Sequence, residues 1–123
     1  MEEQRHYAVT DVYNRKLTLT YKGKTLAETS EALILKEVGK SVYNPVFYLP
    51  KNAIKLELEL DNSRQSHCPI KGDATYWYVK DDPTTNYFGW SYEESDVLPK
   101  AKKIKGYIAF NMQYVTIVSE PIE

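Results

Sequence analysis

The sequence predicts an all-β domain, because apolar residues alternate with polar ones in short runs that turn residues separate. The clearest run covers residues 54–60, where every second residue is Ile or Leu and those between are Lys or Glu. This alternation is typical of a strand with one face in the core. With 123 residues the chain can bury a core as one domain. We therefore expect eight or nine short, mostly antiparallel strands in a sandwich or open barrel.

The first half of the chain is predicted to contain an arm followed by five strands. Residues 1–14 lack clear periodicity and are assigned to the arm, and the single β domain would occupy residues 15–120. Gly23 suits the turn between the first two strands, because glycine readily adopts the positive φ of a tight hairpin. Pro50 should end the fourth strand, because proline cannot donate a ladder hydrogen bond. The five predicted strands are residues 15–21, 25–29, 32–38, 46–49 and 54–60.

The second half begins with a polar segment, residues 61–66, that is predicted to be a loop. It leads to Cys68 and a Pro-x-Lys-Gly turn at residues 69–72. The strand predicted at residues 74–80 has large side chains on both faces, which indicates a central strand that is covered on both sides. Residues 87–92 should pair with it as a hairpin, and residues 93–105 should form a long loop. The last two strands are predicted at residues 106–111 and 113–118.

Charge and cysteine content restrict the possible partners and location. The net charge is −1, and the basic run at residues 100–105 comes three residues after an acidic run at residues 93–96. Because nucleic-acid binding needs several basic side chains on one face, we expect no nucleic-acid partner. A lone cysteine fits a reducing compartment, and no signal peptide or membrane-length apolar run occurs. We expect a cytoplasmic protein without membrane association, as a monomer or a small homo-oligomer.

Cys68, Lys71 and Glu37 are the candidate catalytic residues. Lys71 follows Cys68 across a proline turn, and a nearby cation would favour the reactive thiolate. Glu37 ends an apolar run, so it needs a partner such as Lys71 if it is buried. The alternatives stay open: Cys68 can be a small buried residue, Lys71 an exposed turn lysine, and Glu37 a residue at the solvent side of a strand end.

Metal and cofactor sites are not expected. Zinc sites usually need three or four ligands with a recognisable spacing. The chain has one cysteine and two histidines, His6 and His67, that are far apart in the sequence. It also lacks the glycine-rich phosphate-binding loop of nucleotide-binding proteins.

Four motifs follow one another along the chain, namely Tyr48-Leu49-Pro50, Cys68-Pro69-Ile70-Lys71-Gly72-Asp73-Ala74-Thr75-Tyr76-Trp77, Trp90-Ser91-Tyr92 and Gly106-Tyr107-Ile108-Ala109-Phe110. In this order they resemble the domain-of-unknown-function family 427, over about residues 17–118. Two positions depart from the usual pattern, namely Leu49 in place of Phe and Gly89 in place of Ala. The resemblance implies a small β-tent domain, cytoplasmic and mostly bacterial, and it implies no activity. Relatives of the β-tent fold hold zinc through paired Cys-x-x-Cys motifs, which are missing here.

These observations favour a small-ligand-binding β domain. Its pocket would be lined by aromatic side chains, with Lys71 as the anchor for an anionic ligand. The aromatic candidates are Trp77, Trp90, Tyr107 and Tyr48. One alternative is an enzyme that uses the Cys68, Lys71 and Glu37 cluster for group transfer. Another is a protein-interaction module without a chemical site.

Overall fold

The described part of the chain forms ten strands in two antiparallel sheets. A computed structural model describes residues 7–39, 41–68, 72–93 and 103–122, without the side chains of residues 7, 63–65, 67, 68 and 72. Seven strands form a large sheet in the order β1-β4-β5-β9-β8-β7-β6, and three form a small sheet in the order β10-β2-β3. The strands are β1 (Tyr7–Val12), β2 (Arg15–Tyr21), β3 (Lys24–Thr29), β4 (Leu33–Val38), β5 (Val46–Pro50), β6 (Leu58–Cys68), β7 (Gly72–Val79), β8 (Gly89–Ser91), β9 (Tyr107–Phe110) and β10 (Thr116–Pro121).

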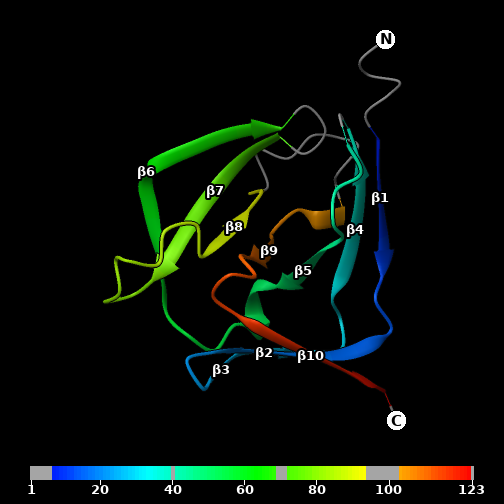
Figure 1. The fold of residues 1–123 in the computed structure, drawn as a ribbon, viewed down its shortest axis with the longest axis horizontal. Helices are drawn as coiled ribbons and strands as arrows, with labels where there is room; N and C mark the ends of the chain where they lie inside the picture. Colours follow the sequence, from blue (N-terminus) through cyan, green and yellow to red (C-terminus); the bar gives the residue numbers. More distant parts are fainter. Residues whose placement is uncertain (1–6, 40, 69–71, 94–102, 123) are drawn as a thin grey trace.

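The predicted all-β class is confirmed, and the large sheet curves around the small one. Figure 1 shows the large sheet passing from β6 and β7 on one side to β4 and β1 on the other. The small sheet lies across the open end between them. A single 3-10 turn, η1 (Lys51–Ala53), follows β5. None of the helical segments in the described residues has the length and apolar character needed to cross a membrane.

Two hydrophobic cores lie on opposite faces of the large sheet. The first core fills the space between the sheets, and β2 contributes its alternate residues Leu17, Leu19 and Tyr21 to it. The second core covers the other face of the large sheet. The first core also contains Leu26, Ala27, Ala32, Leu49, Phe88, Ile108, Phe110 and Val115, and the second contains Leu33, Leu35, Tyr48, Ala74, Tyr92, Ile104 and Ala109.

The central strands therefore bury both of their faces. In β9, Ile108 and Phe110 belong to the first core, whereas Ala109 between them belongs to the second. In β7, Ala74 belongs to the second core, and Trp77 packs against the first. This is the two-sided burial that large residues on both faces of residues 74–80 predicted.

Two segments that were predicted to lie outside the strands belong to the large sheet, and the strand predicted at residues 113–118 is instead β10 at Thr116–Pro121. Residues 7–12, assigned to the arm, form β1, which pairs with β4 from Tyr7↔Val38 to Val12↔Leu33. The segment at residues 61–66, predicted as a loop, belongs to β6, which lies at the edge of the large sheet. A strand at the edge of a sheet has a neighbour on one side only, and such strands commonly carry polar or charged side chains.

The predicted strand at residues 54–60 is interrupted because this segment passes from the small sheet to the large one. Ile54 bridges to Ala27 of β3, and the backbone N–H of Lys55 donates to Leu26 O at 2.7 Å. Further on, Glu57 O accepts a hydrogen bond from the N–H of Lys80. A segment that pairs with two different sheets cannot remain in one ladder, so β6 begins only at Leu58.

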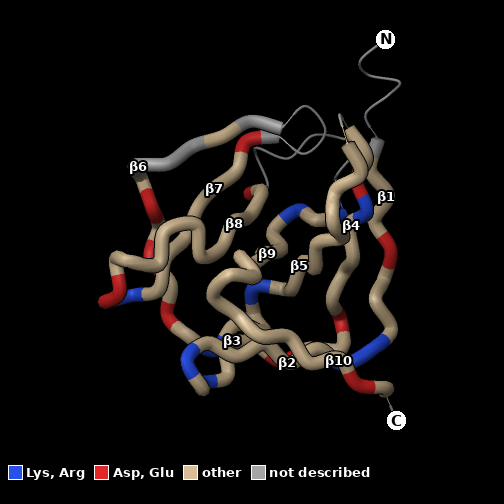
Figure 2. Tube along the Cα trace, in the orientation of Figure 1, with Lys and Arg blue, Asp and Glu red and all other residues tan. Residues whose placement is uncertain are grey.

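Charged residues of both signs are interspersed along the described trace (Figure 2). Several form ion pairs between strands, such as Lys36 with Asp11 at 3.2 Å and Lys80 with Glu57 at 2.7 Å. These side chains are largely exposed, so each pair stabilises the fold only slightly.

Candidate functional site

A pocket lies where β5 and β9 cease to pair. The described ladder between these strands consists of two pairs, Leu49↔Ile108 and Pro50↔Tyr107. Beyond those pairs, toward Val46 and Asn111, a pocket of about 250 Å³ is present. Its lining residues are Leu19, Asn44, Pro45, Val46, Phe47, Leu49, Trp90, Phe110, Asn111, Met112 and Ile117.

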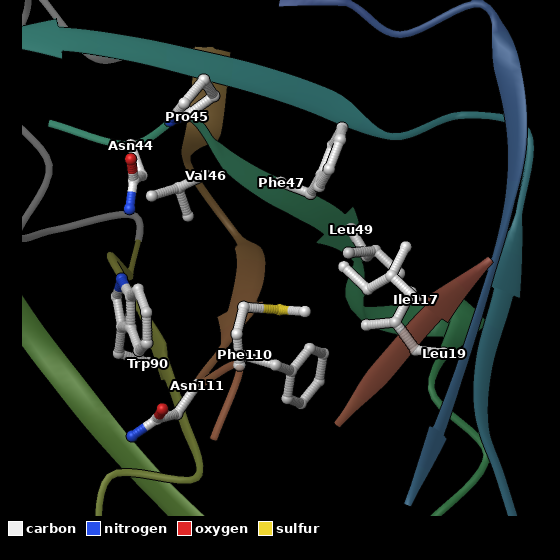
Figure 3. A pocket seen from close by; sticks show the side chains of 11 residues that line it. Leu19, Asn44, Pro45, Val46, Phe47, Leu49, Trp90, Phe110, Asn111 and Ile117 are labelled. Atoms are coloured by element: carbon white, nitrogen blue, oxygen red, sulfur yellow. The ribbon is translucent and has the colours of Figure 1, made fainter. Parts of the chain in front are cut away.

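The pocket has an apolar end and an amide-bearing end. Figure 3 shows Phe47, Leu49 and Phe110 at one end, where β2 and β10 also contribute residues. At the other end, Asn44 and Asn111 lie on either side of Trp90. All of the described side chains that line the pocket are uncharged. The arrangement can hold a neutral group that offers hydrogen bonds at one end only.

Asn111 is held in place by three hydrogen bonds. Its backbone N–H donates to Phe88 O at 2.9 Å, and its carbonyl accepts from the N–H of Tyr114 at 3.0 Å. Its side-chain Oδ1 accepts from the backbone N–H of Gln113 at 3.0 Å. Because an N–H must face an oxygen, this last bond assigns the orientation of the amide and leaves the Nδ2 group as its available donor.

Trp90 connects the pocket to the second core. It lies in β8 opposite Ala109, and its Nε1–H donates to the hydroxyl of Tyr48 at 3.3 Å. Tyr48 is completely buried. The structure thus brings together two of the predicted ligand-binding residues, Trp90 and Tyr48. Tyr107 packs on the same face but does not line this pocket.

Trp77 faces the opposite side of the sheet from Trp90. The register pairs Tyr76 with Trp90 and Trp77 with Gly89, and successive residues of a strand point to opposite faces. Trp77 packs against the first core, and its Nε1–H donates to Ser91 Oγ at 2.9 Å. The structure therefore does not place Trp77 and Trp90 in one pocket floor.

A second, more open pocket of about 270 Å³ lies beside Trp77, with Lys51 and Ile108 in its lining. The ammonium of Lys51 lies 5.4 Å from the centre of the Trp77 ring and 2.5 Å from Glu93 Oε1. Ser91 Oγ donates to Glu93 Oε2 at 2.6 Å.

Glu93 is ionised in this network. Partial burial alone would raise the pKa of its carboxyl, but the hydrogen bonds from Lys51 and Ser91 outweigh burial and hold the pKa below its usual range. The sequence analysis missed this cluster, because Lys51 lies between two predicted strands and Glu93 begins a segment predicted to be a long loop. Both acidic oxygens and the ammonium already have protein partners, so we interpret the cluster as a structural brace.

The proposed catalytic cluster is only partly visible. Glu37 lies in β4 opposite Ala8, which packs against the second core, so Glu37 is on that same face. Cys68 pairs through its backbone with Gly72, but its side chain is outside the described part. Lys71 lies outside the described residues. The group-transfer hypothesis therefore stays a prediction.

Within the described ranges, no group of three or more His, Cys, Asp or Glu side chains is arranged to hold a metal ion.

The chain was compared with known protein families. A family model described as a domain of unknown function, DUF427, matches residues 10–120. The chain belongs to the DUF427 family. The match starts within β1 and ends within β10, so both sheets are parts of the DUF427 domain. No curated protein matches the chain. Because the family description names no activity, a function for this DUF427 protein has to be argued from the geometry of its site.

Proposed function

We propose that this DUF427 protein binds a small, uncharged ligand in the pocket between β5 and β9. The observation that carries the proposal is an apolar pocket whose few polar groups, the amides of Asn44 and Asn111, gather at one end. Ligand sites typically combine apolar walls with a few polar groups in this way. At about 250 Å³ the pocket is slightly below the roughly 300–1,000 Å³ of most such sites, which favours a compact ligand.

The uncharged character of the described lining residues selects against charged ligands. A carboxylate or ammonium that leaves water needs an opposite charge in the site, and these lining residues offer none. This differs from the anionic ligand that Lys71 suggested, and Lys71 itself lies outside the described residues. Buried strand residues such as Leu19, Leu49 and Phe110 form the walls, so the site is largely preformed.

The two tryptophans provide the first test, because they lie on opposite faces of the sheet. Benzyl alcohol can be titrated into Trp77→Phe, whose only tryptophan is Trp90, and into Trp90→Phe, whose only tryptophan is Trp77. We expect a saturable change of tryptophan fluorescence in the first variant and none in the second. A change that appears only in the second variant would place binding at the other pocket and contradict the proposal.

A pocket-filling substitution provides the second test. Val46→Phe adds a ring within the lining and should weaken benzyl alcohol binding at least about tenfold, because the ligand and the ring compete for the same space. Val42→Phe is the matched control, since Val42 is 82% exposed and does not line the pocket. Benzoate, which has a similar ring and a negative charge, should bind the wild type more weakly than benzyl alcohol. Unchanged affinity in a folded Val46→Phe variant would rule out this pocket.

A further inference from the structure

We infer that the ligand presents an amide-type edge, that is, a planar neutral ring with a hydrogen-bond donor and an acceptor on neighbouring atoms. Lactams, cyclic imides and free nucleobases belong to this class. The inference rests on the proposed function of the β5–β9 pocket and specifies what that pocket recognises.

The two asparagine amides are the first argument. A carboxamide presents an acceptor oxygen and a donor nitrogen side by side, and it pairs best with a partner edge that carries the same two groups in the reverse order. Asn44 brings one such group to one end of the pocket, and Asn111 brings a donor nitrogen whose neighbouring oxygen already accepts from Gln113. The remaining described lining is apolar apart from the indole of Trp90. In Figure 3 the Asn44 side chain points from the start of β5 toward the indole of Trp90.

The donor capacity of Asn111 is the second argument. Its Oδ1 already accepts from the backbone N–H of Gln113, so the amide is fixed with Nδ2 as the group that remains for a ligand acceptor. Within the part of the chain that the structure describes, neither Nδ2 of Asn111 nor the amide of Asn44 bonds to another protein group. These amides are therefore available to a ligand, at the cost of displacing water only.

The Trp90 indole supplies the third argument, because it is an aromatic wall between the two amides. Its hydrogen bond to the buried Tyr48 hydroxyl holds the ring in position. Planar rings pack favourably against a fixed aromatic side chain, which favours a flat ligand over a branched aliphatic one.

The volume of the pocket and the charge of its lining further restrict the class of ligand. A volume of about 250 Å³ has room for a compact ring system, and the lining residues that the structure describes include no cation for a phosphate group. The pocket thus fits a free base or lactam better than a nucleotide, whose phosphates would need Lys, Arg or a metal ion.

The test compares 2-pyridone, a lactam with neighbouring N–H and C=O groups, with benzyl alcohol on the wild-type chain labelled with ¹⁵N. We expect 2-pyridone to bind at least about tenfold more tightly, because one well-placed hydrogen bond contributes up to about that factor. The side-chain NH₂ signals of Asn111 should move during the 2-pyridone titration. N-methyl-2-pyridone, which lacks the donor, should bind more weakly than 2-pyridone.

Two variants assign the effect to Asn111. Asn111→Asp keeps an acceptor for the Gln113 N–H and removes the Nδ2 donor, so it should weaken 2-pyridone binding and change benzyl alcohol affinity much less. Asn62→Asp is the matched control, because Asn62 is exposed in β6 and away from the pocket lining. Asn111→Leu removes both the oxygen and the nitrogen of the side-chain amide, and it should likewise weaken 2-pyridone binding. The backbone amide spectrum of this variant checks that it is folded.

The outcomes distinguish a failure of the amide-edge inference from a failure of the proposed ligand-binding function. If 2-pyridone binds no more tightly than benzyl alcohol, or Asn111→Asp affects neither probe, the amide-edge inference is wrong and the pocket remains a binding site. If neither probe binds the wild type, both the inference and the proposed function are wrong.

Discussion

Asp82 connects the two sheets through the contacts of a single side chain. Its carboxylate accepts hydrogen bonds from Tyr21 Oη at 2.8 Å and from Thr84 Oγ1 at 2.5 Å, and Lys22 Nζ lies 3.3 Å away. The bond from Thr84, then that from Tyr21, lowers the pKa of Asp82 to about 2, with a smaller contribution from Lys22. Tyr21 and Lys22 belong to the β2–β3 hairpin, whereas Asp82 lies in the turn after β7.

We predict that Asp82 makes stability depend on pH in the acid range. Its folded pKa of about 2 is below the value near 4 of an unfolded chain, so its contribution is fully present above about pH 4 and is lost as pH falls through about 2. Asp82→Asn should melt at a lower temperature than the wild type at pH 7. It should also show a smaller fall of melting temperature between about pH 4 and 2.

The neighbouring Asp81→Asn variant is the control for this prediction, because it makes the same charge change at an exposed position. Melting curves followed by circular dichroism at several pH values measure both effects. A pH profile of Asp82→Asn that parallels the wild type would show that this carboxylate does not contribute.

At the scale of elements, β8 is short but belongs to two ladders. It has three residues, and it pairs with β7 on one side and β9 on the other. Gly89 permits this close fit, since a Cβ there would lie 3.2 Å from Ala109 O and 3.2 Å from Phe110 Cδ1. Phe110 also lines the pocket, so the packing of β8 affects the shape of the proposed site.

We therefore predict that Gly89→Val destabilises the fold by about 1–3 kcal/mol, the usual range for overpacking a close-packed core. Gly89→Ala should cost less, because its single added carbon requires neighbouring atoms to move by only a few tenths of an ångström. Urea unfolding of both variants measures the difference. Equal stability of Gly89→Val and the wild type would show that β8 and β9 separate more easily than the packing indicates.

At the scale of the whole molecule, the C-terminal strand completes the small sheet. β10 pairs with β2 from Thr116↔Thr20 to Pro121↔Arg15, which joins segments near the two ends of the chain. Ser119 Oγ accepts from Arg15 Nε at 2.7 Å and lies 2.8 Å from the hydroxyl of Tyr13. β10 also contributes Ile117 to the first core and to the pocket.

Removal of residues 116–123 should abolish cooperative unfolding. The truncation leaves one edge of β2 unpaired and uncovers part of the first core, and a domain of this size has only about 5–15 kcal/mol of stability to lose. Calorimetry should show no sharp transition for the truncated chain. The milder full-length variant Ser119→Ala should keep the transition and lose about 1 kcal/mol. A sharp transition of the truncated chain near the wild-type temperature would contradict this role of β10.

Local pattern was sufficient to predict most of the strands. The alternation of Leu17, Leu19 and Tyr21 identified both β2 and its buried face, because side chains of a strand point to opposite sides whatever its partner. The same pattern was insufficient for β1 and for the polar part of β6. Both lie at the edges of the large sheet, where a strand forms because its backbone can hydrogen-bond to the neighbouring strand. For β1 that neighbour is β4.

The sequence by itself predicted the all-β class and the DUF427 membership, and it named Tyr48 and Trp90 among the candidate ligand-binding residues, which stays a prediction. Only the tertiary structure decided that Trp77 faces away from Trp90, and that the pocket lies between β5 and β9 with Asn44 and Asn111 at one end. The physical reason is that side-chain alternation is a property of each strand alone. Register between strands, and the place where two strands stop pairing, depend on contacts between residues far apart in the chain.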